Sequence, residues 1–73
     1  MKRWHRSMKR KPMVGIDILI IWTNNTVEIG TMLEDEFGES YLYTDGDSSD
    51  WSAVKDDIKL WAYVDKYFEK ELK

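Results

Sequence analysis

Apolar residues recur with a period of two along the first clear element of the chain. Between Ile16 and Trp22, three isoleucines and the tryptophan occupy every second position, while Leu19 and Ile21 lie on the opposite face. This pattern predicts a strand over residues 16–22. A strand that is apolar on both faces is usually central in its sheet and covered on both sides.

A second strand follows a short polar turn. The residues from Thr23 to Thr26 suit a tight hairpin turn, because asparagine tolerates the positive φ that such turns require. Residues 26–33 then form the return strand, whose more apolar face is made of Val27, Ile29, Thr31 and Leu33. We expect Val27 and Ile29 to lie in the core.

Three shorter segments complete residues 34–50. The charged residues 34–39 predict a turn, and residues 40–44 have the β propensity of a short third strand. Residues 45–50 consist of Asp, Gly and Ser, a composition that indicates a loop.

The last segment, residues 51–73, admits two interpretations. One is a single long helix, supported by six apolar residues near helical spacing: Trp51, Val54, Ile58, Trp61, Phe68 and Leu72. The other is a fourth strand over residues 57–62 followed by a helix over residues 64–72, where Val64, Phe68 and Leu72 recur at steps of four. Periodicity alone slightly favours the long helix.

Composition narrows the class of protein. The 73 residues allow one domain, and an aromatic content of 14% gives a short chain large rings with which to build its core. The absence of cysteine excludes disulfides, cysteine-based zinc sites and thiol nucleophiles. The longest apolar stretch, Ile18 to Trp22, is far shorter than a bilayer requires, so we expect no membrane segment and a cytoplasmic location.

Charge is distributed unevenly along the chain. Residues 1–11 contain six basic side chains, whereas residues 12–73 contain five basic and fourteen acidic ones, a balance of −9. This asymmetry predicts a basic N-terminal arm over residues 1–11, followed by one small domain over residues 12–73.

The spacing of several residues resembles that of a known family. Trp4 is followed eight positions later by Pro12, then by Gly15 and the strand residues 18–20, and the stretch 58–64 lies near the other end. This frame resembles the small, mostly phage- and prophage-associated family called domain of unknown function 551. Its members open with Trp, reach Leu-Pro eight residues later, continue through Gly into a Val-Leu-Val-like strand, and close on a Thr-His-Trp-Met-Pro-Leu-Pro-like stretch.

The chain departs from the family pattern at defined positions. Lys11 replaces the leucine before Pro12, Lys59 and Leu60 replace Thr-His, and the closing prolines are absent. The resemblance implies a small sheet in which the residues before Trp61 are extended. It therefore favours the strand over residues 57–62. It also implies a phage or prophage origin, and therefore a location in the host cytoplasm. It points to no particular activity, because none is attached to the family.

We therefore expect an α+β fold: a small antiparallel sheet of three or four strands with a C-terminal helix packed on one face. The predicted core consists of Ile18, Ile20, Val27, Ile29, Leu42, Ile58, Trp61, Val64 and Phe68.

An acidic segment invites a calcium-binding interpretation. Asp45, Asp47 and Ser49 match the first ligand positions of an EF-hand loop, and Asp56 matches the twelfth. However, Asp50 occupies the sixth position, where the loop needs glycine, and the twelfth position needs a bidentate glutamate. A solvated acidic turn explains the segment better, and we expect no metal and no cofactor.

Two charged surfaces are candidates for binding. Lys9, Arg10 and Lys11 could contact an anion such as a nucleic-acid phosphate, although the acidic body would repel the rest of that partner. Alternatively, the arm could pair with the body itself. Residues 34–57 carry nine carboxylates and one lysine, a surface that could counter a basic cleft on another protein or serve solubility alone.

Aromatic residues are the remaining candidates. Trp22, Trp51 and Tyr43 could contact a partner, because so small a core cannot hold every ring. An edge strand could also pair with its copy, so the chain could be a monomer or a homodimer. His5 has no nucleophile or carboxylate near it in sequence, which argues against catalysis. We expect a non-enzymatic accessory protein that acts by protein–protein contact; the alternative is a small nucleic-acid-binding module that uses the basic arm.

Overall fold

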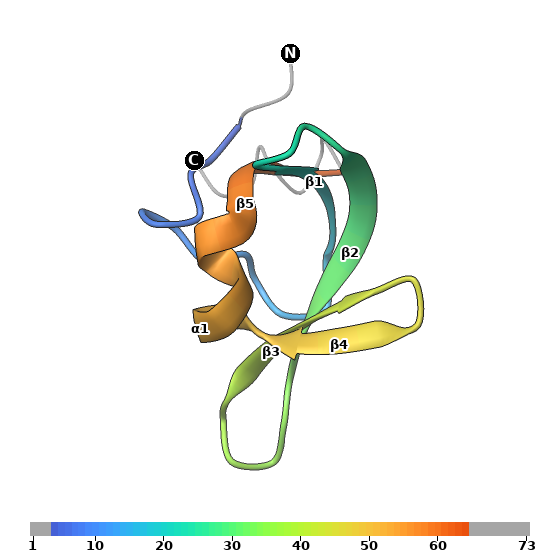
Figure 1. Ribbon diagram of the computed structural model, residues 1–73. Helices are drawn as coiled ribbons and strands as arrows, with labels where there is room; N and C mark the ends of the chain where they lie inside the picture. Colours follow the sequence, from blue (N-terminus) through green and yellow to red (C-terminus); the bar gives the residue numbers. More distant parts are fainter. Residues whose placement is uncertain (1–3, 65–73) are drawn as a thin grey trace.

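An antiparallel sheet forms the body of the protein in a computed structural model that describes residues 4–64 (Figure 1). Its five strands are β1 (Asp17–Trp22), β2 (Val27–Glu34), β3 (Ser40–Thr44), β4 (Asp47–Asp50) and β5 (Ile58–Tyr63). A short helix, α1 (Trp51–Val54), and a 3-10 turn, η1 (Lys55–Asp57), connect β4 to β5. The strand order is β4-β3-β2-β1-β5, so β1 is an interior strand, next to both β2 and β5.

The expected architecture is confirmed in outline and changed in detail. The sheet is small and antiparallel with a short helix, as an α+β fold requires, but it has five strands instead of three or four. Within residues 4–64, the α-helix lies in mid-chain, at Trp51–Val54. The helix predicted for residues 64–72 lies, apart from Val64, outside the described residues.

The fifth strand comes from the segment predicted to be a loop. Asp45 and Gly46 have φ values of 44° and 90° and form a two-residue turn, and Asp47–Asp50 returns beside β3. Two successive residues with positive φ are typical of hairpin turns whose twist matches that of the strands. The loop prediction for residues 47–50 was wrong because an edge strand that is exposed throughout needs no apolar residues.

The ambiguous segment is resolved in favour of a strand. Residues 58–63 are extended and pair with β1, which confirms the predicted strand to within one residue. The single long helix is wrong, since α1 ends at Val54. As part of β5, which pairs with β1, both Ile58 and Trp61 are buried. Contacts between strands therefore decide the structure of this segment, although its apolar residues also fit helical spacing.

The loop between β1 and β2 determines how the two strands face each other. Trp22 N donates to Thr26 O at 2.9 Å, which leaves the three residues 23–25 as the loop. Asn25 N donates to Trp22 O at 2.8 Å, and Asn25 has a φ of 70°. This is the three-residue hairpin in which a turn is followed by one left-handed residue.

Because the loop has an odd number of residues, even-numbered residues of β1 lie opposite even-numbered residues of β2. Ile18 lies opposite Gly30, and Ile20 lies opposite Glu28. A two-residue loop would instead place Ile29 beside Ile20, and a shift of one residue turns every side chain of a strand to the other face. For this reason the prediction for the face of β2 was wrong: Gly30 and Met32 face the core.

The core combines predicted and additional residues. Ile18, Ile20, Leu42, Ile58 and Trp61 are buried as predicted. The buried cluster also contains three residues outside that prediction: Met32, Trp51 and Tyr63. Three predicted core residues are largely exposed in the structure: Val27, Ile29 and Val64. Phe68 lies outside the described residues.

Gly30 lets β2 pass close to its neighbours. A Cβ atom at this position would lie 2.7 Å from Thr44 Cγ2 and 3.0 Å from Ile20 Cδ1. Real Cβ atoms do not approach other carbons so closely. The missing side chain therefore allows β2 to bend, and in Figure 1 the hairpin of β3 and β4 turns away from β1 and β5.

The basic N-terminal segment packs along the outer edge of β5 (Figure 1, blue). His5 and Trp61 exchange two backbone hydrogen bonds, with N–O distances of 2.7 and 2.9 Å, and their rings lie 4.5 Å apart. Trp61 Nε1 donates to Arg10 O at 3.1 Å, and Met13 N donates to the Tyr63 hydroxyl at 3.1 Å. The polar atoms of both buried rings are thus bonded to this segment.

Ser7 connects the same segment to the start of η1 and to the start of β5. It is only 5% exposed, and its hydroxyl contacts Lys55 O and Ile58 O, the latter at 3.1 Å. A buried hydroxyl that bonds residues about fifty positions away ties the start of the described chain to its end.

We predict that Ser7→Ala lowers the free energy of unfolding by about 2 kcal/mol, because the buried hydrogen bond to Ile58 O and the contact with Lys55 O are both lost. Urea denaturation followed by tryptophan fluorescence measures this change. Ser52→Ala, at an exposed position of α1, is the matched control and should change stability by less than about 0.5 kcal/mol. Equal effects of the two substitutions would contradict a structural role for Ser7.

Candidate partner-binding surface

The outer face of the sheet carries apolar side chains where a solvated sheet usually carries polar ones. The register places Leu60, Ile21 and Val27 in one row across β5, β1 and β2. A second row contains Ala62, Leu19 and Ile29. We call these six residues the outer apolar patch.

Exposure varies across the outer apolar patch. Val27 and Ile29 are 58% and 57% exposed, Leu19, Ile21 and Leu60 are half-buried, and Ala62 is buried. The most exposed part therefore lies on β2. Cross-strand apolar pairs stabilise a sheet, but the free surface of Val27 and Ile29 gains nothing from the fold itself.

A polar pair interrupts the apolar surface beyond this patch. Asp17 and Thr31 lie opposite each other, and Thr31 Oγ1 donates to Asp17 Oδ1 at 2.7 Å. On the far side of this pair, the outer face continues with Leu33, Tyr41 and Tyr43. Tyr43 is 45% exposed, whereas Tyr41 is half-buried.

The carboxylates of residues 34–57 are all on the surface. They lie at the end of β2 and in the β2–β3 loop, the β3–β4 turn, β4 and η1, and every one of the nine is exposed. Asp35 also shapes its own loop, because its Oδ1 accepts from Phe37 N and Glu39 N at 2.9 Å each. The seven carboxylates from Glu34 to Asp50 make the surface around the β3–β4 half of the molecule strongly acidic, and Asp56 and Asp57 lie apart from them in η1.

The segment that invited a calcium interpretation is a hairpin. Asp45 lies in its turn, while Asp47 and Ser49 follow along an extended strand and Asp56 lies in η1. An extended strand spreads its side chains along a line, whereas a calcium loop wraps them around the ion. Within residues 4–64, no cluster of three potential metal ligands is present.

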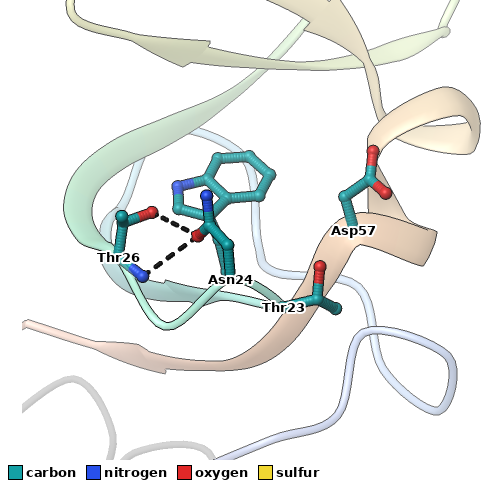
Figure 2. Close-up of a pocket in the computed structure, with 5 residues that line it drawn as sticks. Thr23, Asn24, Thr26 and Asp57 are labelled. Atoms are coloured by element: carbon teal, nitrogen blue, oxygen red, sulfur yellow. Dashed lines mark hydrogen bonds between the residues drawn. The ribbon is translucent and has the colours of Figure 1, made fainter.

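A shallow pocket of about 420 Å³ lies at the β1–β2 loop (Figure 2) and is lined by Trp22, Thr23, Asn24, Thr26 and Asp57. Its polar groups hold the loop in shape. Asn24 Oδ1 accepts from Thr26 N and Thr26 Oγ1 at 3.0 and 2.6 Å, and Asp57 O accepts from Thr23 N at 2.8 Å. We assign these contacts to the geometry of the hairpin.

The three aromatic candidates lie in different environments. Trp51 is 7% exposed and packs in the core, so its ring has little surface for a partner. Trp22 is half-buried, and its Nε1 donates to Glu28 Oε1 at 2.8 Å. Tyr43 alone presents a large ring surface on the outer face.

The three basic candidates also separate. Lys9 and Arg10 are exposed on a tight turn. The backbone N–H groups of both residues donate to Arg6 O at 3.0 Å. Lys11 Nζ donates to Ser40 Oγ at 2.9 Å and lines a pocket together with Glu39 and Asp50. Part of the basic segment thus lies against the acidic body.

The outer apolar patch escaped sequence reasoning, which assigned Val27 and Ile29 to the core. Period-two alternation states which residues share a face but not which face is buried. The sequence contained one usable signal, Asn25. Asparagine tolerates the positive φ that the third residue of a three-residue hairpin loop adopts, and Asn25 has such a φ in the structure.

No protein-family model matches the chain, and comparisons with curated proteins and with solved structures found no match. No helix within residues 4–64 has the length and apolar character needed to cross a membrane.

Substitutions of two isoleucines on opposite faces test the assignment of the faces. Ile20→Thr should lower the free energy of unfolding by about 3 kcal/mol, because it removes buried apolar contacts and buries a hydroxyl. Ile29→Thr keeps the β-branched shape on an exposed surface and should cost less than about 1 kcal/mol. Urea denaturation of both variants gives the comparison, and a cost for Ile29→Thr as large as that for Ile20→Thr would place Ile29 in the core.

Proposed function

We propose that this protein is a non-enzymatic accessory protein that acts by binding another protein through the outer apolar patch. The observation that carries the proposal is the exposure of Val27 and Ile29 at the β2 end of the outer apolar patch. Apolar side chains grouped on a surface mark contact sites more often than scattered ones do. The family resemblance agrees with this role, since it implies a phage or prophage origin and no activity.

The charge of the molecule indicates which partner suits this surface. The nine carboxylates of residues 34–57 are exposed, and the same segment contains only one lysine, Lys55. A partner with a basic rim around an apolar centre would match both features. Opposite charges around an interface raise the association rate and make binding depend on salt.

The test uses a partner captured from host lysate and then purified. We expect Val27→Thr/Ile29→Thr to weaken its binding at least tenfold in calorimetry, because the exposed apolar centre is lost. Val14→Thr is the matched control, since Val14 is also 46% exposed but lies outside the patch. The proposal fails if the double variant binds as tightly as the original chain, or if no purified partner binds at low salt.

A second candidate function is nucleic-acid binding by the basic N-terminal segment. The observation that favours it is the backbone turn over residues 6–10, which carries three exposed basic residues: Arg6, Lys9 and Arg10. A held cluster of positive charge suits phosphate contacts. The acidic body and the engagement of Lys11 with Ser40 weaken this candidate.

A gel shift with single-stranded and double-stranded DNA and RNA at low salt separates the two functions. If the second candidate is correct, Lys9→Gln/Arg10→Gln abolishes the shift while Lys55→Gln/Lys59→Gln leaves it unchanged. We expect no shift with the original chain, and a shift that depends on Lys9 and Arg10 would replace our proposal.

A further inference from the structure

The two edges of the sheet differ in how they are covered. The edge at β5 is occupied by the N-terminal segment through the backbone pair of His5 and Trp61. At the other edge, β4 has β3 as its only strand neighbour within residues 4–64, and all four of its residues are exposed. An uncovered edge strand is a template for pairing with another chain.

The hairpin geometry identifies the backbone groups that face outward. Thr44 and Asp47 flank the two-residue turn and form its hydrogen-bonded pair. Bonded and non-bonded pairs alternate along an antiparallel ladder, so Ser49 bonds to β3 while Ser48 and Asp50 do not. The N–H and C=O groups of Ser48 and the N–H group of Asp50 therefore point away from the sheet, toward an incoming strand. The C=O group of Asp50 accepts the first hydrogen bond of α1, because Asp50 is the N-cap of that helix.

The charge of this edge selects its occupant. Asp47 and Asp50 lie on β4, and Asp45 and Glu39 are exposed nearby in the flanking turns and pocket. A second copy that paired its own β4 here would place carboxylates against carboxylates, and like charges on paired strands are destabilising. A strand that carries Lys or Arg instead gains both the ladder hydrogen bonds and opposite charge.

We propose that the β4 edge accepts an extended basic segment of a partner protein as a sixth strand. The N–H and C=O of Ser48 and the N–H of Asp50 supply the ladder bonds, and the nearby carboxylates select basic side chains. Main-chain bonds provide affinity and side chains provide specificity in this mode of binding. The inference rests on the proposed function, namely binding to a basic protein, but it uses a surface separate from the outer apolar patch.

The probe is a ten-residue peptide of alternating lysine and valine, titrated at low salt into the isotopically labelled chain. We expect the amide signals of Ser48 and Asp50 to shift and their hydrogen exchange to slow. Ser48→Pro removes one outward N–H without touching a ladder bond to β3, and it should weaken binding at least tenfold. Ser48→Ala keeps that N–H and should bind as the original chain does.

Two further variants make the outcome decisive. Asp47→Asn/Asp50→Asn keeps every backbone group and should also weaken binding at least tenfold, which tests the charge without any risk to the fold from proline. Val27→Thr/Ile29→Thr alters only the outer apolar patch and should leave peptide binding unchanged. The sixth-strand proposal is overturned if the lysine peptide does not bind, if a glutamate–valine peptide binds equally well, or if the shifts map to the outer apolar patch. If Val27→Thr/Ile29→Thr weakens binding of the partner and the two edge variants, Ser48→Pro and Asp47→Asn/Asp50→Asn, do not, the proposed function stands and the role of the β4 edge is rejected.

Discussion

The loop between β1 and β2 holds three residues, and this odd number sets the register on which the sheet depends. It places Gly30 beside Ile18, so that the glycine can pass within contact distance of Ile20 and of Thr44 on β3. Met32 then follows into the core. The same register turns Val27 and Ile29 outward, because successive residues of a strand point to opposite faces. One left-handed asparagine therefore links the packing of the core to the surface proposed for binding.

The N-terminal segment adds a second constraint, because it covers one edge of the sheet and leaves the other edge open. It bonds to Trp61 and Tyr63 and covers the edge at β5, which also brings basic side chains to that side of the molecule. The edge at β4 keeps its outward backbone groups and its carboxylates. The charge asymmetry along the sequence thereby becomes a difference between the edges: the open β4 edge carries carboxylates, and the basic segment covers the β5 edge, with Lys11 reaching Ser40.

Much of the strand content could be predicted from local pattern, and the missed parts have identifiable causes. β1 and β3 follow from alternation and β propensity, and β5 required the family resemblance because its residues also fit helical spacing. β4 was missed because composition outweighed the Asp45-Gly46 turn signal, which is a strong hairpin indicator. Of the candidate site residues, Tyr43 is exposed, whereas Trp51 completes the core.

The sequence by itself determined that β1 is apolar on both faces, that no cysteine chemistry is available, and that positive charge precedes a long acidic segment. These properties depend only on residue type and on near neighbours. The tertiary structure alone decided that Val27 and Ile29 face outward, that Trp51 is buried, and that β4 is left at an open edge. Register and strand order decide such matters, and both depend on hydrogen bonds and packing between residues that are far apart in the chain.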